Sequence, residues 1–348
     1  MKRLLTACAL LALLAVGVRL VLPGSPGRAA LAYDTGSLNA LSEVWVADAA
    51  GHARRRLGSG ARPLLSPDGR LVGASSVGQA GPALTLFSSS GSRLGAFFDA
   101  RQQTAVAQSW SPDSRYLAVV LASRDPVSDV ASGLAVIDVA SRSYRTVARG
   151  TLYGASFAPG GSDRLAYAVA PTTSLSAAVN IHVVGADGSG GQQLTRDGRS
   201  LYPVWGPDLI AFDHERLRER ADPAYALWVM SPEGARPRQL ARTRVPPLHE
   251  GLVPLGFSAD GAKLLAEYVG ADTSRAWSVE VGAAHARQLL LSGHSVSGAA
   301  ISRDGRQLLV DRGGYLNPPD DGIVEAMPFG GGSGRTLIQH GSDPSWNL

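Results

Sequence analysis

The chain has 348 residues, 45% of them hydrophobic, and its 41 glycines and 21 prolines are typical of many short strands and turns. Its formal charge of +4 comes from four basic residues that precede the first acidic residue, Asp34; the other 29 basic residues (33 less these four) balance 29 acidic residues. A neutral body lacks the basic surface that binds phosphate groups, which excludes nucleic acid as a partner.

Residues 1–22 are predicted to be a signal peptide or an amino-terminal membrane anchor. Lys2 and Arg3 precede an uncharged apolar run from Leu4 to Val18, which is the order of a secretory signal. The run is short for a membrane-spanning helix, which needs about 20 residues. Cys8, the only cysteine, lies in this run, so the chain has no intramolecular disulfide. We therefore expect an exported protein that is periplasmic, extracellular or anchored facing outward.

The point of signal cleavage stays open. Ala30-Leu31-Ala32 has the small residues of a cleavage site, but a cut there removes a predicted strand at 29–34. Cleavage after Gly17, or retention of the segment as an anchor, keeps that strand. The folded part is predicted to be one domain over residues 28–348.

A short turn motif recurs six times at a period of about 40 to 50 residues, which is typical of propellers and solenoids. In its fullest form, Leu65-Ser-Pro-Asp-Gly-Arg70, proline fixes φ, aspartate bonds back to the backbone, and glycine takes the positive φ that follows. The motif therefore joins two strands tightly. Its copies begin at Leu65, Trp110, Phe157, Trp205, Phe257 and Ile301.

A second repeated element is an alternating apolar stretch of about eight residues that ends in a turn, the pattern of a strand–turn–strand hairpin. Turn motif and hairpin together supply four strands, the content of one propeller blade. The hairpin copies begin at Val44, Leu84, Leu134, Ile181, Leu227, Trp277 and Ile323.

The sequence has seven hairpins but only six complete turn motifs, and this difference predicts how the ring closes. Trp346 stands where a seventh motif is expected, and its matching strand, 29–34, lies at the other end of the sequence. We predict an all-β propeller of seven blades of four antiparallel strands, closed by strands from both termini. Six blades is the alternative, if residues 323–338 are only a tail.

The Trp110-Ser-Pro-Asp-Ser-Arg type of motif, followed by Leu117-Ala-Val, resembles the repeat of the TolB-type propellers and of the amino-terminal propellers of prolyl-oligopeptidase-like peptidases. The resemblance covers nearly the whole chain after the leader. It implies envelope scaffolds, partner-binding lids on peptidases and a minority of lyases. This sequence has neither the α/β domain of TolB before the repeats nor a Gly-x-Ser-x-Gly elbow, which argues against a TolB role and against peptidase activity.

The histidines form no metal-binding sequence motif. Because some TolB-like propellers are implied to be lyases that hold a divalent metal with histidines from several blades, His214, His249 and His294 form a hypothesis for such a site. The alternative interpretation is surface histidines on separate blades. We predict no catalytic, metal-binding or cofactor-binding residues, and no cofactor.

Four other features are interpreted as structural. Asp187-Gly-Ser-Gly-Gly is a hairpin turn rather than a calcium loop, and Gly330-Gly-Gly-Ser-Gly lacks the lysine of a phosphate loop. The charged run 215–222 is predicted to be a solvated loop. The tryptophans that open motifs, Trp110, Trp205 and Trp346, are predicted to pack between blades.

Together these features predict an exported, non-catalytic propeller, monomeric, that acts as a protein- or ligand-binding scaffold in the bacterial cell envelope. Its partner is expected to be an envelope protein or polymer, with membrane contact only through the amino-terminal segment if that segment is uncleaved. The alternative is a metal-dependent polysaccharide lyase or another channel-mouth enzyme. Both functions rest on analogy of fold.

Overall fold

The computed structural model describes residues 28–35, 42–76, 78, 80–125, 132–172, 177–216, 224–240, 249–270, 274–291, 294–312 and 322–347. In these ranges the chain forms strands and connecting turns without a helix, and it has no helix that could span a membrane. The predicted signal or anchor, 1–22, lies outside the described residues.

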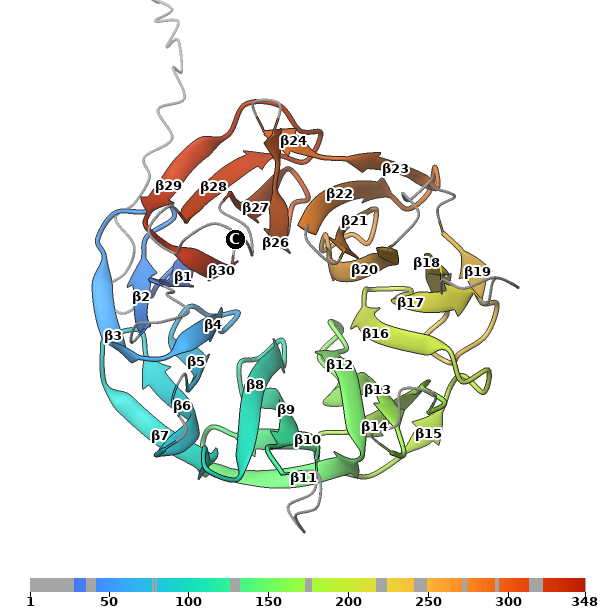
Figure 1. The fold of residues 1–348 in the computed structure, drawn as a ribbon, viewed down its shortest axis with the longest axis horizontal. Helices are drawn as coiled ribbons and strands as arrows, with labels where there is room; N and C mark the ends of the chain where they lie inside the picture. Colours follow the sequence, from blue (N-terminus) through green and yellow to red (C-terminus); the bar gives the residue numbers. More distant parts are fainter. Residues whose placement is uncertain are drawn as a thin grey trace, which may run out of the picture.

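Seven four-stranded antiparallel sheets stand around a common axis (Figure 1). The predicted all-β, seven-bladed fold is confirmed. From the innermost strand outward, blade 1 consists of β30 (Ser342–Trp346), β1 (Leu31–Asp34), β2 (Glu43–Ala47) and β3 (Arg55–Ser59), and blade 2 of β4 (Ala61–Leu65), β5 (Leu71–Ser75), β6 (Pro82–Ser88) and β7 (Arg93–Asp99). Blade 3 consists of β8 (Gln103–Trp110), β9 (Tyr116–Ser123), β10 (Gly133–Asp138) and β11 (Ser143–Arg149). Blade 4 consists of β12 (Thr151–Phe157), β13 (Arg164–Ala170), β14 (Asn180–Gly185) and β15 (Gln192–Gln193).

Blades 5 to 7 follow the same order, and a small hairpin joins blades 6 and 7. The strands are β16 (Ser200–Trp205), β17 (Ile210–Arg216), β18 (Ala224–Met230), β19 (Arg238–Gln239); β20 (His249–Phe257), β21 (Lys263–Gly270), β22 (Ser274–Glu280), β23 (His285–Gln288); the hairpin β24 (Leu290–Leu291) and β25 (His294–Ser295); and β26 (Ser297–Ile301), β27 (Gln307–Asp311), β28 (Ile323–Pro328), β29 (Arg335–Gln339). The six-blade alternative is wrong, because β28 and β29 are the outer half of a complete seventh blade.

The ring closes in blade 1, as the sequence predicts. The innermost strand β30 comes from the carboxyl-terminal end and pairs antiparallel with β1, with Leu31 opposite Trp346. Leu117 lies opposite Trp110 in the same way in blade 3. The two distant segments therefore reproduce the pairing that a turn motif makes locally.

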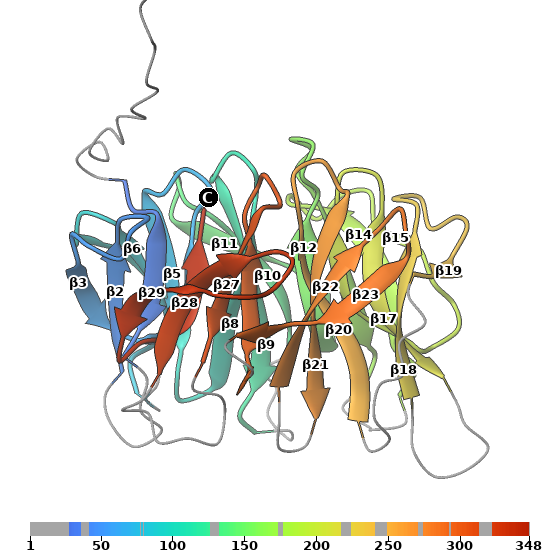
Figure 2. The same cartoon turned by 90° about the horizontal axis from the view of Figure 1, so that it is seen from above.

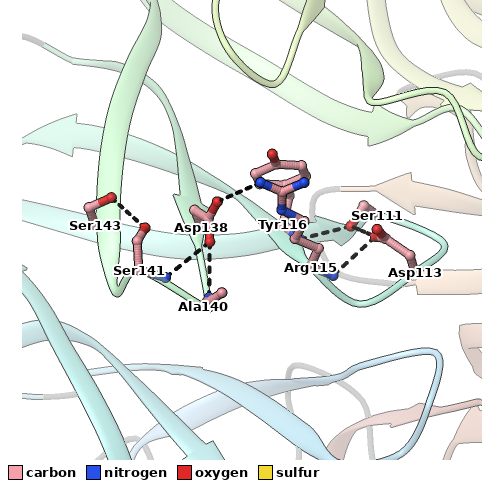
Figure 3. Close-up of polar contacts among 8 residues, drawn as sticks. All are labelled: Ser111, Asp113, Arg115, Tyr116, Asp138, Ala140, Ser141 and Ser143. Carbon is pink, nitrogen blue, oxygen red and sulfur yellow. Dashed lines mark hydrogen bonds and ion pairs between the residues drawn. The ribbon is translucent and has the colours of Figure 1, made fainter.

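The turn motif is held by hydrogen bonds from one serine and one aspartate (Figure 3). Ser111 Oγ donates to Asp113 Oδ1 at 2.6 Å and accepts the Tyr116 N–H at 2.8 Å. Asp113 Oδ1 also accepts the Arg115 N–H at 3.1 Å, and the hydrogen bond from Ser111 is the largest cause that lowers the pKa of Asp113. Ser66, Ser258 and Ser302 bond in the same way.

The core is divided among the gaps between blades. Each of the seven clusters of buried apolar side chains in the described residues combines two neighbouring blades. The tryptophans that open motifs lie in these clusters, and Trp110 Nε1 donates to the Leu64 carbonyl of the preceding blade at 3.0 Å. Their predicted position between blades is confirmed for Trp110, Trp205 and Trp346.

A serine just before the motif links several blades directly. Ser109 Oγ accepts the backbone N–H of Phe157, Ser156 Oγ that of Trp205, and Ser345 Oγ that of Leu65, each at 3.0 Å. The acceptor belongs to the innermost strand of one blade and the donor to that of the next. These bonds fix the innermost strands relative to one another.

Candidate functional site

The two ends of the ring are built differently (Figure 2). One end carries the repeated turn motifs and the tight turns between third and fourth strands. At the other end, the number of residues between the second and third strands varies, from three between β21 and β22 to eleven between β27 and β28. Loops of varied length on a rigid scaffold are where binding sites are most often found.

At this variable end, acidic residues repeat at one position of the second strand. In each blade, the first residue of the turn motif pairs with a residue of the second strand. The acidic position lies three residues further along that second strand. It is acidic in four consecutive blades, from blade 5 to blade 1, whereas blades 2 to 4 have Ser75, Val120 and Ala168 there. The four acids are Asp213, Glu267, Asp311 and Asp34.

Three of these carboxylates bond to the innermost strand of the next blade. That strand contains a β-bulge, and the carboxylate accepts a backbone N–H that lies within the bulge or directly beside it. Asp34 Oδ2 accepts the Arg62 N–H at 2.7 Å, and Glu267 Oε1 accepts the Gly298 N–H at 3.1 Å.

The third such bond joins blade 7 to blade 1, where the Asp311 carboxylate accepts the backbone N–H of Asp343. Sequence reasoning missed these acids. The signal that could have found them is an acid ending an apolar triplet, as in Leu31-Ala-Tyr-Asp34 and Leu308-Leu-Val-Asp311.

The bulge also presents different side chains near the axis. Arg62, Tyr202 and Asp343 occupy the same bulge position in three blades, have φ of 50°, 50° and 46°, and are exposed. Tyr202 packs edge-to-face with Tyr153 of blade 4, with ring centroids 6.1 Å apart. One repeated backbone feature thus displays a basic, an aromatic and an acidic side chain.

A pocket of about 460 Å³ lies between blades 4 and 5. Its walls include Phe212 and His214 of β17 and Trp228 of β18. The segment between β15 and β16, which contains Asp197, also lines it. The outer strands β15 and β19 have two residues each, whereas β7 and β11 have seven. The pocket therefore lies in the part of the ring where the outermost strands are shortest.

An Asp197–His214 pair forms the polar part of this pocket. His214 Nε2 lies 3.1 Å from Asp197 Oδ2, and the imidazole packs on the Trp228 ring at 4.6 Å. Burial alone raises the pKa of Asp197, but hydrogen bonds from His214, the Arg199 N–H and Ser200 Oγ outweigh it and lower the pKa to about 2. The carboxylate is ionised throughout the physiological range.

The structure gives only part of the proposed histidine site. His214 lies in the wall of the pocket, on the second strand of blade 5. The backbone of His249 begins β20 in blade 6, and that of His294 begins the hairpin strand β25; both side chains lie outside the described residues. Among the side chains that the structure describes, no three His, Cys, Asp or Glu residues are grouped to hold a metal ion.

The other predicted features lie where turns were expected. Asp187 is in the β14–β15 hairpin turn and its Oδ1 accepts the Ser189 N–H at 2.9 Å. The glycine-rich segment beginning at Gly330 connects β28 and β29. Most of the charged run 215–222 lies outside the described residues.

The seven-fold blade arrangement makes this chain a seven-bladed β-propeller, and comparison with known proteins agrees at the level of fold. No protein-family model matches the chain, and no curated protein sequence matches it. The β-propeller domain of the trilobed protease from Pyrococcus furiosus aligns with a TM-score of 0.63 at 10% identity, covering 90% of this chain and 93% of that one.

Two further solved structures align with lower scores. TolB from Acinetobacter baumannii gives a TM-score of 0.55 at 12% identity, with 92% of this chain and 66% of that one covered, so the chain spans slightly less than two thirds of TolB. An oligogalacturonate lyase in complex with manganese gives 0.54 at 15% identity, with 80% and 76% covered. The resemblance to TolB-type propellers is thereby confirmed for the fold.

Proposed function

We propose that this chain is an exported, non-catalytic β-propeller that binds a protein or polymer partner in the bacterial cell envelope. The observation that carries the proposal is the contrast between the two ends of the ring. Motif serines and aspartates repeat at one end and build the scaffold, whereas the bulge residues Arg62, Tyr202 and Asp343 differ from blade to blade and are exposed. Variable side chains on a rigid repeat are how repeat proteins acquire specific binding surfaces.

The partner is expected to contact the variable end near the axis. Two tyrosines allow a matched test: Tyr202 lies on an innermost strand and is 37% exposed, and Tyr144 lies on the outer strand β11 and is 53% exposed. Each would be replaced by a photo-crosslinking phenylalanine analogue in the producing cell. We expect a discrete adduct from position 202 and none from position 144. Equal adducts at both positions, or none at 202, would contradict the proposal.

Export has a separate test. The basic and apolar order of residues 1–22 supports it. Cell fractionation followed by sequencing of the mature amino terminus distinguishes a cleaved signal from a retained anchor. A protein with its original amino terminus in the cytoplasmic fraction would refute the export proposal.

A metal-dependent polysaccharide lyase is the second candidate. It is favoured by the place of His214 in the pocket wall, with an Nδ1 that has no hydrogen-bond partner among the described atoms. Dialysis of the purified protein against Mn²⁺, followed by plasma mass spectrometry, tests it. One retained metal per chain that is lost in His214→Ala would favour the lyase. Equal metal content in the two proteins would remove His214 from any metal site.

A further inference from the structure

The contact between blades 7 and 1 differs from its neighbours in the charges that it brings together. In the contacts on either side, an acid bonds to a residue in or beside the bulge that is not acidic, namely Gly298 or Arg62. Between blades 7 and 1, Asp311 of β27 meets Asp343 of β30. Here both the carboxylate and the bulge side chain are acids.

Two observations show that this pair has too few partners to hold both carboxylates ionised without cost. Asp311 Oδ1 is buried and has no hydrogen-bond partner among the described atoms. The side chain of Asp343 is exposed, but the protein around it reduces its hydration, and this raises its pKa. The charge of Arg62 acts in the opposite direction and lowers the pKa of Asp343. Burial disfavours an ionised carboxylate when one of its oxygens has no hydrogen-bond donor, and the single Asp343 N–H on Asp311 offsets this only in part.

Other charged groups around Asp311 do not supply the missing cation. Asp34 and Glu267 act on it as further negative charges. The neighbouring Arg312 is engaged with Glu325 of β28, at 3.5 Å between Nε and Oε2. The charged residues of the described elements around Asp311 are Asp34, Arg62, Glu267, Arg312, Glu325 and Asp343.

We propose that the contact between blades 7 and 1 is a proton-dependent latch, which holds β30 firmly in acid and loosens at neutral pH. The contact between blades 7 and 1 suits this role because β30 closes the ring. This strand bonds to β1 on one side and packs against blade 7. Loss of a proton at Asp311 therefore acts on the strand that joins the two ends of the fold.

The direction and size of the effect follow from linkage. Burial first, and then the charges of Asp343, Asp34 and Glu267, raise the pKa of Asp311 from 3.8 to about 7. When the contact between blades 7 and 1 opens and Asp311 becomes hydrated, the pKa of Asp311 returns toward 3.8. The equilibrium constant for opening then rises about tenfold per pH unit between these values, about a thousandfold in all, and levels off above pH 7.

Hydrogen exchange measured by mass spectrometry on the full chain between pH 4 and pH 8 tests the latch. Exchange of β1 and β30 amides, corrected for intrinsic rates, is compared with that of β13 in blade 4, where Ala168 occupies the position of Asp311. We expect opening at β1 and β30 to increase with pH and level off near pH 7, while β13 shows no such rise. The same pH dependence in both places would overturn the proposal.

A pair of variants tests the residue itself. Asp311→Asn keeps the shape of the side chain without its ionisation, and we expect it to reduce the pH dependence of β30 opening to the smaller part that comes from Asp343. Asp208→Asn removes an exposed acid in a turn at the opposite end of the ring and should leave the wild-type profile unchanged. An Asp311→Asn profile that still follows the wild type would show that other groups cause the effect. If that variant does not fold, the comparison of β30 with β13 in the wild type still decides.

Discussion

Removal of Trp346, Asn347 and Leu348 should destabilise the whole propeller, because Trp346 and Asn347 complete the closure of the ring. Trp346 is 9% exposed and packs in the cluster between blades 7 and 1 with Leu31 and Leu309. Loss of a buried tryptophan side chain costs about 3–5 kcal/mol. The Asn347 amide donates to the Ala29 and Pro67 carbonyls at 3.3 and 3.4 Å, and at these distances adds less than about 1 kcal/mol.

The total is a large part of the roughly 5–15 kcal/mol that stabilises a typical domain. We expect the melting temperature to fall by about 5 °C or more, measured by calorimetry at constant pH. Deletion of Leu348 alone, which leaves Trp346 and Asn347 in place, is the matched control. An unchanged melting temperature after removal of all three residues would refute the closure argument.

Two further predictions concern single residues. Asp197→Asn should remove a stabilising effect that is present above pH 3.8 and is lost as the pH falls through about 2, because the folded-state pKa of Asp197 is lowered. Urea unfolding of both proteins at pH 7 and at pH 2 checks this, and a difference as large at pH 2 as at pH 7 would contradict it. Gly69→Ala should cost more than Gly81→Ala: both glycines have positive φ, 71° and 84°, but a Cβ at 69 would lie 2.3 Å from the Ala29 carbonyl oxygen, while a Cβ at 81 meets nothing within 4 Å. Strain alone costs about 1–2 kcal/mol, and equal losses of stability in the two variants would remove the role of the Ala29 contact.

The sequence was sufficient for the blades because each depends on local chemistry. The turn from Ser111 to Tyr116 is held by side chains within five residues of each other, so its pattern is readable at every copy. The closure was also predictable, since Trp346 and the strand at 29–34 are the two halves of one more unit. Counting repeated units was enough to place segments from opposite ends of the sequence side by side.

The candidate sites were less predictable because they depend on contacts between blades. Asp34 acts on the Arg62 N–H, and that donor is free only because of a bulge in the next blade. The pocket arises from short outer strands and from a link that brings Asp197 to His214, 17 residues further along the chain. No local pattern records either arrangement, and the proposed grouping of His214 with His249 and His294 stays a prediction.

The pairing of β30 with β1 also has a consequence for the order of folding. Ser342 Oγ donates to Asp34 Oδ1 across a separation of 308 residues, so this contact closes a loop that includes nearly every other strand. Contacts between residues so distant in sequence form slowly, because the entropy of the intervening chain must be lost first. Blades 2 to 7 can each assemble from consecutive residues, whereas blade 1 must wait for β30. Until that strand arrives, β1 is an unpaired edge that invites pairing with another chain.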